Sequence, residues 1–339
     1  MTPHDLLPFG IYETPITARI HERIKETQRA IPTAASGITE ATTKDVDPRF
    51  AAAVSQHFAR VIEQRLLEIK KPEERVALIN NLAQHLGADE KVSAEQLLYA
   101  MYRSELTEPP VLPEVSLNSS ALFTNSVDDT NMSVEIAREI RTADSVDLLC
   151  AFIKNSGISA ISDELEYLRD HQIPLRVITS TYCGATEAAA VRRLVEDYNA
   201  EVRICYEHKT TRLHAKAWLF RRESGFDTAF IGSSNLSRSA LVDGWEWNVR
   251  GSRSTTPEII EKFIKTFDSY WHDNHFKHFD PERDYERLLE ALRGAKFLEA
   301  KQDEKLELSG LRVEPYPYQQ EMLEALHSER AVHGRHKTC

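Results

Sequence analysis

Apolar residues in the first third of the chain recur every three or four positions. Between residues 50 and 69 this spacing marks one helical face, and a second helix with a proline in its first turn is predicted over residues 72–86. A third, shorter helix is predicted over residues 94–101. The segment 108–113 contains three prolines and cannot be helical, so we place a domain boundary after a helical N-terminal region of residues 1–112.

Beyond this boundary the pattern changes to short β-rich runs that alternate with helical ones. Helices are predicted over residues 158–168, 187–198 and 257–270. This alternation is typical of an α/β sheet, and we assign residues 113–280 to one α/β domain. The predicted strands are residues 148–153, 175–180, 201–206, 213–220, 228–231 and 245–250.

Composition places the chain among globular proteins, since 41% of its 339 residues are hydrophobic and 28% are charged. Its apolar runs are far shorter than the ~18 residues that span a bilayer, and its start lacks a secretory signal pattern. We therefore expect a cytoplasmic protein without a membrane partner. The cysteines are scattered, without zinc-site spacing, and are expected to be reduced: Cys150, Cys183, Cys205 and Cys339.

The net charge of −11 alone disfavours a protein that coats DNA electrostatically. Residues 203–253, however, contain nine basic and five acidic residues. This window is locally basic, and it contains the residues whose chemistry is most specific.

Within the run 212–220, alternation along a strand predicts that His214 and Lys216 share one face and act on one ligand. The segment Gly232-Ser233-Ser234-Asn235 then offers hydroxyl, amide and backbone groups that suit a phosphate. Further along, Glu246 lies among apolar residues of a predicted strand, where a carboxylate can orient a histidine.

The order His214-x-Lys216, Gly232-Ser233-x-Asn235 and Glu246 resembles the signature of the phospholipase D superfamily, most closely its nuclease branch. The general pattern has an aspartate five residues after the lysine, where this sequence has Arg221. In a subgroup that includes certain restriction endonucleases a later glutamate takes that place, and Glu246 matches it. The resemblance implies a phospholipase-D-like mixed sheet flanked by helices.

The resemblance also implies metal-free phosphodiester cleavage through a covalent phosphohistidine, with DNA as substrate and no cofactor. Two imidazoles are needed, one as nucleophile and one as acid. The other His-x-Lys, His275-Phe276-Lys277, lacks a following Gly-Ser-x-Asn and is taken as a chance match, so a homodimer that shares its site is expected. The catalytic candidates are His214, Lys216, Asn235 and Glu246.

Further substrate-binding candidates lie around this motif: Ser233, Ser234, Arg212, Lys154 and Ser156. Lys154 and Ser156 follow a predicted strand, as residues 179–182 follow another, so both could line the same pocket. Ordinary turn and capping roles are the alternative. Two other groups also have two interpretations. Trp218, Trp245 and Trp247 suit either base stacking or core and dimer contacts, and His272, His275 and His278 suit either a metal or a helix end.

The end of the chain resembles the opening of superfamily-two helicases, where an aromatic residue and a glutamine, here Gln319, precede the motor. We expect a helical connector over residues 281–310 and the truncated start of a motor over residues 311–339. No Walker A loop occurs, so ATP would act only with the missing motor, the expected partner. The alternatives are a non-catalytic nucleic-acid-binding module of a helicase and, less favoured, a phospholipase.

Overall fold

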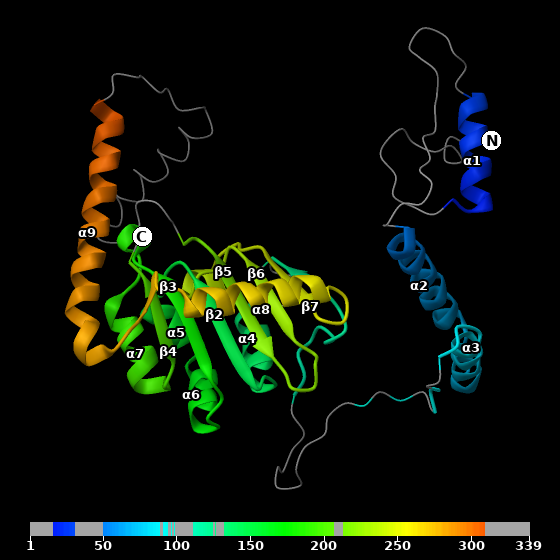
Figure 1. The fold of residues 1–339 in the computed structure, drawn as a ribbon, viewed down its shortest axis with the longest axis horizontal. Helices are drawn as coiled ribbons and strands as arrows, with labels where there is room; N and C mark the ends of the chain where they lie inside the picture. Colours follow the sequence, from blue (N-terminus) through cyan, green and yellow to red (C-terminus); the bar gives the residue numbers. More distant parts are fainter. Residues whose placement is uncertain are drawn as a thin grey trace. The chain divides into compact units, whose positions relative to one another are not determined.

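The computed structural model of the protein describes residues 16–30, 50–88, 91–93, 96, 98, 111–124, 126, 132–206 and 213–308. The chain divides into two compact units, Met1–Met101 and Tyr102–Cys339. Figure 1 shows the helices of the first unit in blue and the sheet of the second in green and yellow.

The first unit contains the helices α1 (Ala18–Ala30), α2 (Phe50–Glu68) and α3 (Pro72–His85) among its described residues. Two of these confirm the helices predicted over residues 50–69 and 72–86, and a proline opens α3 as expected. Most of the third predicted helix lies outside the described residues.

The second unit is built on one mixed eight-stranded sheet with the order β1-β7-β6-β5-β2-β3-β4-β8. The central strands β2, β3 and β4 run parallel, and the remaining neighbours pair antiparallel. The predicted α/β class with a mixed sheet is confirmed. The strands are β1 (Ala121–Phe123), β2 (Ser145–Cys150), β3 (Leu175–Ser180), β4 (Glu201–Cys205), β5 (Lys216–Arg221), β6 (Thr228–Gly232), β7 (Asn248–Ser252) and β8 (Phe276–His278).

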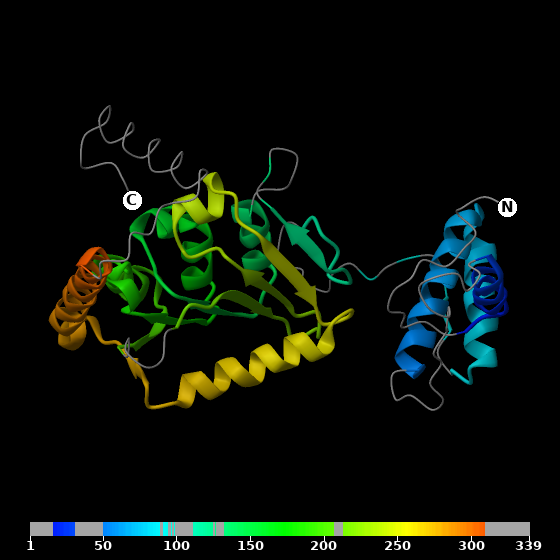
Figure 2. The ribbon, with the colours of Figure 1, turned by 90° about the horizontal axis from the view of Figure 1, so that it is seen from above.

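Helices cover both faces of this sheet (Figure 2). On one face α8 (Pro257–His272) packs its buried Ile260, Phe263 and Phe267 against apolar side chains of the central strands. The main core lies on the other face. It is formed with α4 (Met132–Arg141), α5 (Asn155–Ala160), α6 (Ser162–Asp170), α7 (Ala188–Tyr198) and α9 (Pro281–Leu308).

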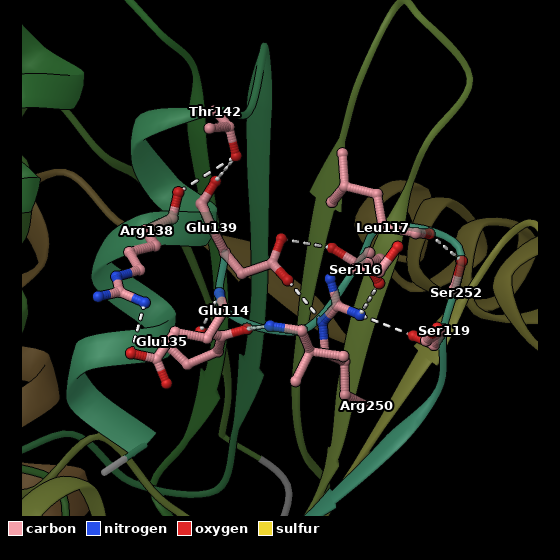
Figure 3. Close-up of polar contacts among 12 residues, drawn as sticks. Glu114, Ser116, Leu117, Ser119, Glu135, Arg138, Glu139, Thr142, Arg250 and Ser252 are labelled. Atoms are coloured by element: carbon pink, nitrogen blue, oxygen red, sulfur yellow. Dashed lines mark hydrogen bonds and ion pairs between the residues drawn. The ribbon is translucent and has the colours of Figure 1, made fainter. Parts of the chain in front are cut away.

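Charged side chains buried in the core tie α4 to the β6–β7 half of the sheet (Figure 3). Glu139 is fully buried and accepts hydrogen bonds from Arg222 and, at 2.7 Å, from Nε of Arg250. Arg250 also donates to the main-chain oxygens of Ser116 and Ser119, at 3.0 and 2.7 Å. Because each buried charge has an opposite partner, this network holds the segment before β1 and strand β7 in place.

A second charged cluster fastens α8 to the opposite face. The carboxylate of Asp147, 1% exposed, pairs with Arg176 and Arg221, each at 2.7 Å. Both guanidinium groups also reach Asp268 of α8, at 2.9 and 3.1 Å. Arg221, which stands where the superfamily pattern has an aspartate, is therefore part of the structural frame.

Some of the boundaries predicted from periodicity were wrong. The strand expected over residues 148–153 begins earlier, because the polar Ser145 and Asp147 pair with β5. It ends at Cys150, which is its last residue paired with β5. The single helix expected over residues 158–168 is two helices, α5 and α6, which meet at Ile161 (φ −131°, ψ 28°). That backbone conformation is not helical and breaks the hydrogen-bond ladder.

Candidate active site

The histidine of the His-x-Lys motif lies just before β5, a central strand of the sheet. Strand β5 pairs with β2 up to the pair of Lys216 and Cys150, which is the last residue of β2. His214 lies two residues before the strand and is exposed. The expectation that His214 belongs to the strand was wrong, because β5 begins at Lys216, where its pairing with β2 ends.

Lys216 and His214 are nevertheless in contact. The Lys216 Nζ lies 2.9 Å from Nδ1 and 3.1 Å from Nε2 of His214, and it donates to the His214 carbonyl oxygen at 2.8 Å. Lys216 is 8% exposed. Burial lowers its pKa, and the negative charge of Glu246 acts in the opposite direction. An ammonium group thus lies directly beside the imidazole.

The neighbouring thiol does not compete with His214 as a nucleophile. Cys150 is fully buried, and burial raises its pKa to about 12, so it remains a neutral thiol at physiological pH.

The Gly-Ser-x-Asn turn follows β6, the neighbour of β5. Gly232 pairs with Asn248 of β7, and a Cβ atom at Gly232 would lie 2.2 Å from the Trp247 oxygen. Only glycine permits this close approach of the two backbones. Ser233 N donates to the same Trp247 oxygen at 3.2 Å, so the turn and the segment before β7 are held together.

Glu246 lies in that segment and contacts the turn directly. Its carboxylate accepts a hydrogen bond from the Ser233 hydroxyl group, which in turn accepts one from Trp247 N at 3.1 Å. The expectation that Glu246 sits within a strand was wrong, because β7 begins at Asn248, opposite the end of β6. The loop places the carboxylate beside Ser233 and close enough to affect Lys216.

The other two residues of the turn point inward. Asn235 is 7% exposed, and its Oδ1 accepts a hydrogen bond from Phe152 N at 3.2 Å. Ser234 is 3% exposed. Its hydroxyl group accepts from Asn248 Nδ2 at 2.8 Å and donates to Ala240 O at 3.3 Å. The sequence-based assignment of Ser234 to substrate binding therefore does not fit its place inside the protein.

The segment after β2 lies against this turn. Lys154 N donates to Leu236 O at 2.9 Å, and Ser156 Oγ accepts from Arg238 N at 3.4 Å. The structure thus brings the predicted Lys154 and Ser156 to the Gly-Ser-x-Asn turn. Arg212, the remaining predicted contact, lies outside the described residues.

Tyr182 is a site residue whose role the sequence did not single out. Its ring lies 5.9 Å from that of His214 at an interplanar angle of 89°, an edge-to-face contact. The sequence did place Tyr182 just after a predicted strand, among the residues 179–182 that were expected near the pocket.

The three tryptophans near the motif differ in exposure. Trp218 is 2% exposed and stacks on Phe220 in the core. Trp245 and Trp247, on either side of Glu246, are 91% and 64% exposed. They therefore expose large apolar side chains immediately before and after Glu246 in the chain.

The second His-x-Lys is remote from the first. His275 lies just before β8, and Lys277 lies within it. Strand β8 is an edge strand, separated from β5 by β2, β3 and β4. Throughout the described part of the chain, no cluster of three or more His, Cys, Asp or Glu residues has the arrangement of a metal site. Among the described helices, none combines the length and apolar character needed to cross a membrane.

The family described as "Cardiolipin synthase, PLD-like domain" matches residues 136–271. No curated protein matches the sequence. Similar solved structures include Nuc from Salmonella typhimurium, a phospholipase D family member, with 15% identity, a TM-score of 0.38, and coverage of 48% of this chain and 97% of Nuc.

NucT from Helicobacter pylori is similar at 16% identity and a TM-score of 0.37, over 48% of this chain and 99% of NucT. Phosphatidylserine synthase from Haemophilus influenzae is similar at 12% identity and a TM-score of 0.37, over 71% and 56% of the two chains. The family match contains β2 to β7 and every described motif residue. Residues 136–271 are a phospholipase-D-like domain of the phospholipase D superfamily.

Proposed function

We propose that this protein is a metal-independent DNA phosphodiesterase, a nuclease that works through a phosphohistidine on His214. The observation that carries the proposal is the contact of Lys216 Nζ with His214, at 2.9 Å from Nδ1, beside a turn in which Ser233 bonds Glu246. These groups combine a nucleophile, a fixed positive charge and hydrogen-bond donors. The spacing of Glu246 from Asn235 resembles the nuclease branch.

In the proposed reaction a neutral His214 attacks phosphorus, and the bond from phosphorus to the leaving oxygen breaks. A second, protonated imidazole gives its proton to that oxygen. Water then attacks the phosphohistidine, the second imidazole takes a proton from the water, and His214 is released. Lys216, Asn235 and Ser233 stabilise the charge on the non-bridging oxygens, and Glu246 orients the donors.

We infer that the second imidazole is His214 of another protomer, in a homodimer. Three half-exposed apolar residues of adjacent strands, which we call the β1-β7-β6 patch, support this inference. Leu122 lies opposite Val249, and Val249 opposite Ile231, with exposed fractions of 47%, 54% and 45%. Ile231 directly precedes Gly232, so the patch extends to the end of β6, where the Gly-Ser-x-Asn turn begins. A second copy that covers this patch would bring two sites together.

We further propose that Lys154, Ser156 and Arg212 bind phosphates that flank the scissile one. The resemblance of residues 311–323 to a helicase opening supports coupling to a helicase motor in a longer protein, although that segment lies outside the described residues. Cytoplasmic defence against foreign DNA would fit this combination.

The direct test is cleavage of plasmid and single-stranded DNA in EDTA, by the wild type and by His214→Ala. We expect metal-free cleavage that His214→Ala abolishes while DNA affinity is retained. We also expect DNA attached to His214 when the reaction is stopped without acid. His275→Ala, which alters the second His-x-Lys, is the matched control and should cleave normally. Strict Mg²⁺ dependence with no trapped adduct would contradict the proposed chemistry.

The alternative function is that of a binding module, which binds the phosphates of DNA but does not cleave it. It is favoured if the wild type binds DNA but cleaves nothing, with or without a helicase partner. A phospholipase is favoured instead if choline release or phosphatidyl transfer exceeds DNA cleavage under the same conditions.

A further inference from the structure

The turn that follows β3 is fixed to the ends of two other strands. The hydroxyl group of Ser180, the last residue of β3, donates to Ala151 O after β2 at 2.9 Å and accepts from Tyr182 N at 3.3 Å. Thr181 N donates to Cys205 O at the end of β4, at 3.1 Å. The ends of the central parallel strands therefore fix the backbone at Tyr182.

The next two residues hold the chain in an uncommon conformation. Cys183 and Gly184 both have φ near 57°, in the left-handed region. For a residue with a side chain, such as Cys183, this conformation is strained and persists only where the surroundings impose it. Such strain is concentrated at functional sites.

The surrounding element is α9, whose Leu288 and Leu292 belong to the main core. A Cβ atom at Gly184 would lie 2.4 Å from Leu292 O and 2.4 Å from Lys296 Cγ. The backbone of α9 therefore rests directly on the turn, and only a residue without a side chain fits between them.

We propose that Tyr182 is a positioning residue for His214, and that α9 sets its place through Gly184; this inference rests on the proposed function of His214. The Tyr182 ring meets the His214 ring edge-to-face at 5.9 Å. His214 precedes β5, and its ring nitrogens contact Lys216 Nζ. The edge-to-face contact with Tyr182 limits rotation of the imidazole from another side. In-line attack on phosphorus requires such a fixed ring.

The test measures kcat and KM for a short labelled DNA with the full chain. Tyr182→Leu is expected to lower kcat about tenfold with KM changed less than about twofold, because orientation and not binding is lost. Tyr182→Phe keeps the ring and should recover most of kcat. Gly184→Ala should match the loss of Tyr182→Leu, and the double variant should lose no more. Tyr167→Leu is the matched control, since the ring of Tyr167 on α6 also contacts a histidine ring, that of His171, at 4.0 Å.

A second measurement does not depend on turnover. In protein with ¹³C-labelled histidine, the His214 ring signal is assigned with His214→Gln. We expect the Tyr182 ring-current shift of this signal to vanish in Tyr182→Leu and to remain in Tyr182→Phe and Tyr167→Leu. If the wild type cleaves no DNA, the proposed function fails while this shift still decides the contact. An unchanged shift, an unchanged kcat, or a rise in KM alone in Tyr182→Leu would overturn the positioning role.

Discussion

The carboxylate of Glu246 accepts a hydrogen bond from the hydroxyl group of Ser233, a residue of the Gly-Ser-x-Asn turn. The two residues belong to different sides of the β6–β7 hairpin, and Trp247 N donates to the same hydroxyl at 3.1 Å. The Ser233 hydroxyl group therefore links the Glu246 carboxylate to the turn. The pair is one unit that presents a carboxylate near Lys216.

Because they act as one unit, Ser233 and Glu246 should be coupled energetically. We expect Ser233→Ala and Glu246→Gln each to lower kcat/KM by about 10- to 100-fold, and the double variant to lose little more than the worse single variant. A double-mutant cycle on DNA cleavage measures the coupling. Fully additive losses would show that the two residues act separately.

Lys216 should titrate below the ordinary lysine value of 10.5, because burial disfavours its charged form. Burial of the ammonium lowers the free energy of unfolding at a pH below the folded-state pKa of Lys216. This destabilisation disappears as the pH rises from that pKa toward 10.5. NMR titration of ¹³C-labelled lysine side chains measures the pKa of Lys216, assigned with Lys216→Arg. Glu246→Gln should lower it further, since the charge of Glu246 favours the ammonium. A pKa for Lys216 at or above 10.5 would contradict this account.

A shared site predicts a specific response to mixed protomers. When wild type and His214→Ala are refolded together in equal amounts, activity should fall to about one quarter, because two intact copies of His214 are needed in one pocket. Independent sites would leave about one half. Light scattering should show a dimer, and a charge in the β1-β7-β6 patch, such as Val249→Asp, should give inactive monomers. The same aspartate at the exposed Val134, far from the patch in sequence and on α4, serves as the control.

The buried network around Glu139 should dominate the stability of the second unit. Glu139→Gln or Arg250→Met leaves opposite charges buried without full compensation, and should lower the free energy of unfolding by about 3–5 kcal/mol. Lys265→Ala breaks the exposed pair with Glu261 on α8 and should cost under about 1 kcal/mol. Urea unfolding followed by tryptophan fluorescence measures both. Comparable small losses would mean that the network is not a main support of the fold.

Local pattern was sufficient for the class of fold and for most of the elements. Helices α2, α3, α7 and α8 and strand β3 lie within one or two residues of the predicted bounds, because apolar periodicity reflects which face of one segment is buried. The motif residues around His214 and Gly232 were also found from the sequence, since their types and spacing carry the resemblance to the phospholipase D superfamily.

Pairing between distant segments decided the remainder. His214 lies outside β5 because β2 ends at Cys150, and Glu246 meets Ser233 because β7 pairs with β6 only from Asn248 onward. No periodicity within one segment specifies where its partner strand stops.

The same reason applies to the buried charges and to Tyr182. Arg222 and Arg250 are hydrophilic by type, yet they are buried because Glu139, more than eighty residues earlier in the chain, neutralises them. Tyr182 contacts His214 because β3 and β5 flank β2 in the sheet and α9 presses on the turn. The register of the assembled sheet determines which residues become neighbours. The local sequence shows the residue types in a segment, but not which distant residues they contact.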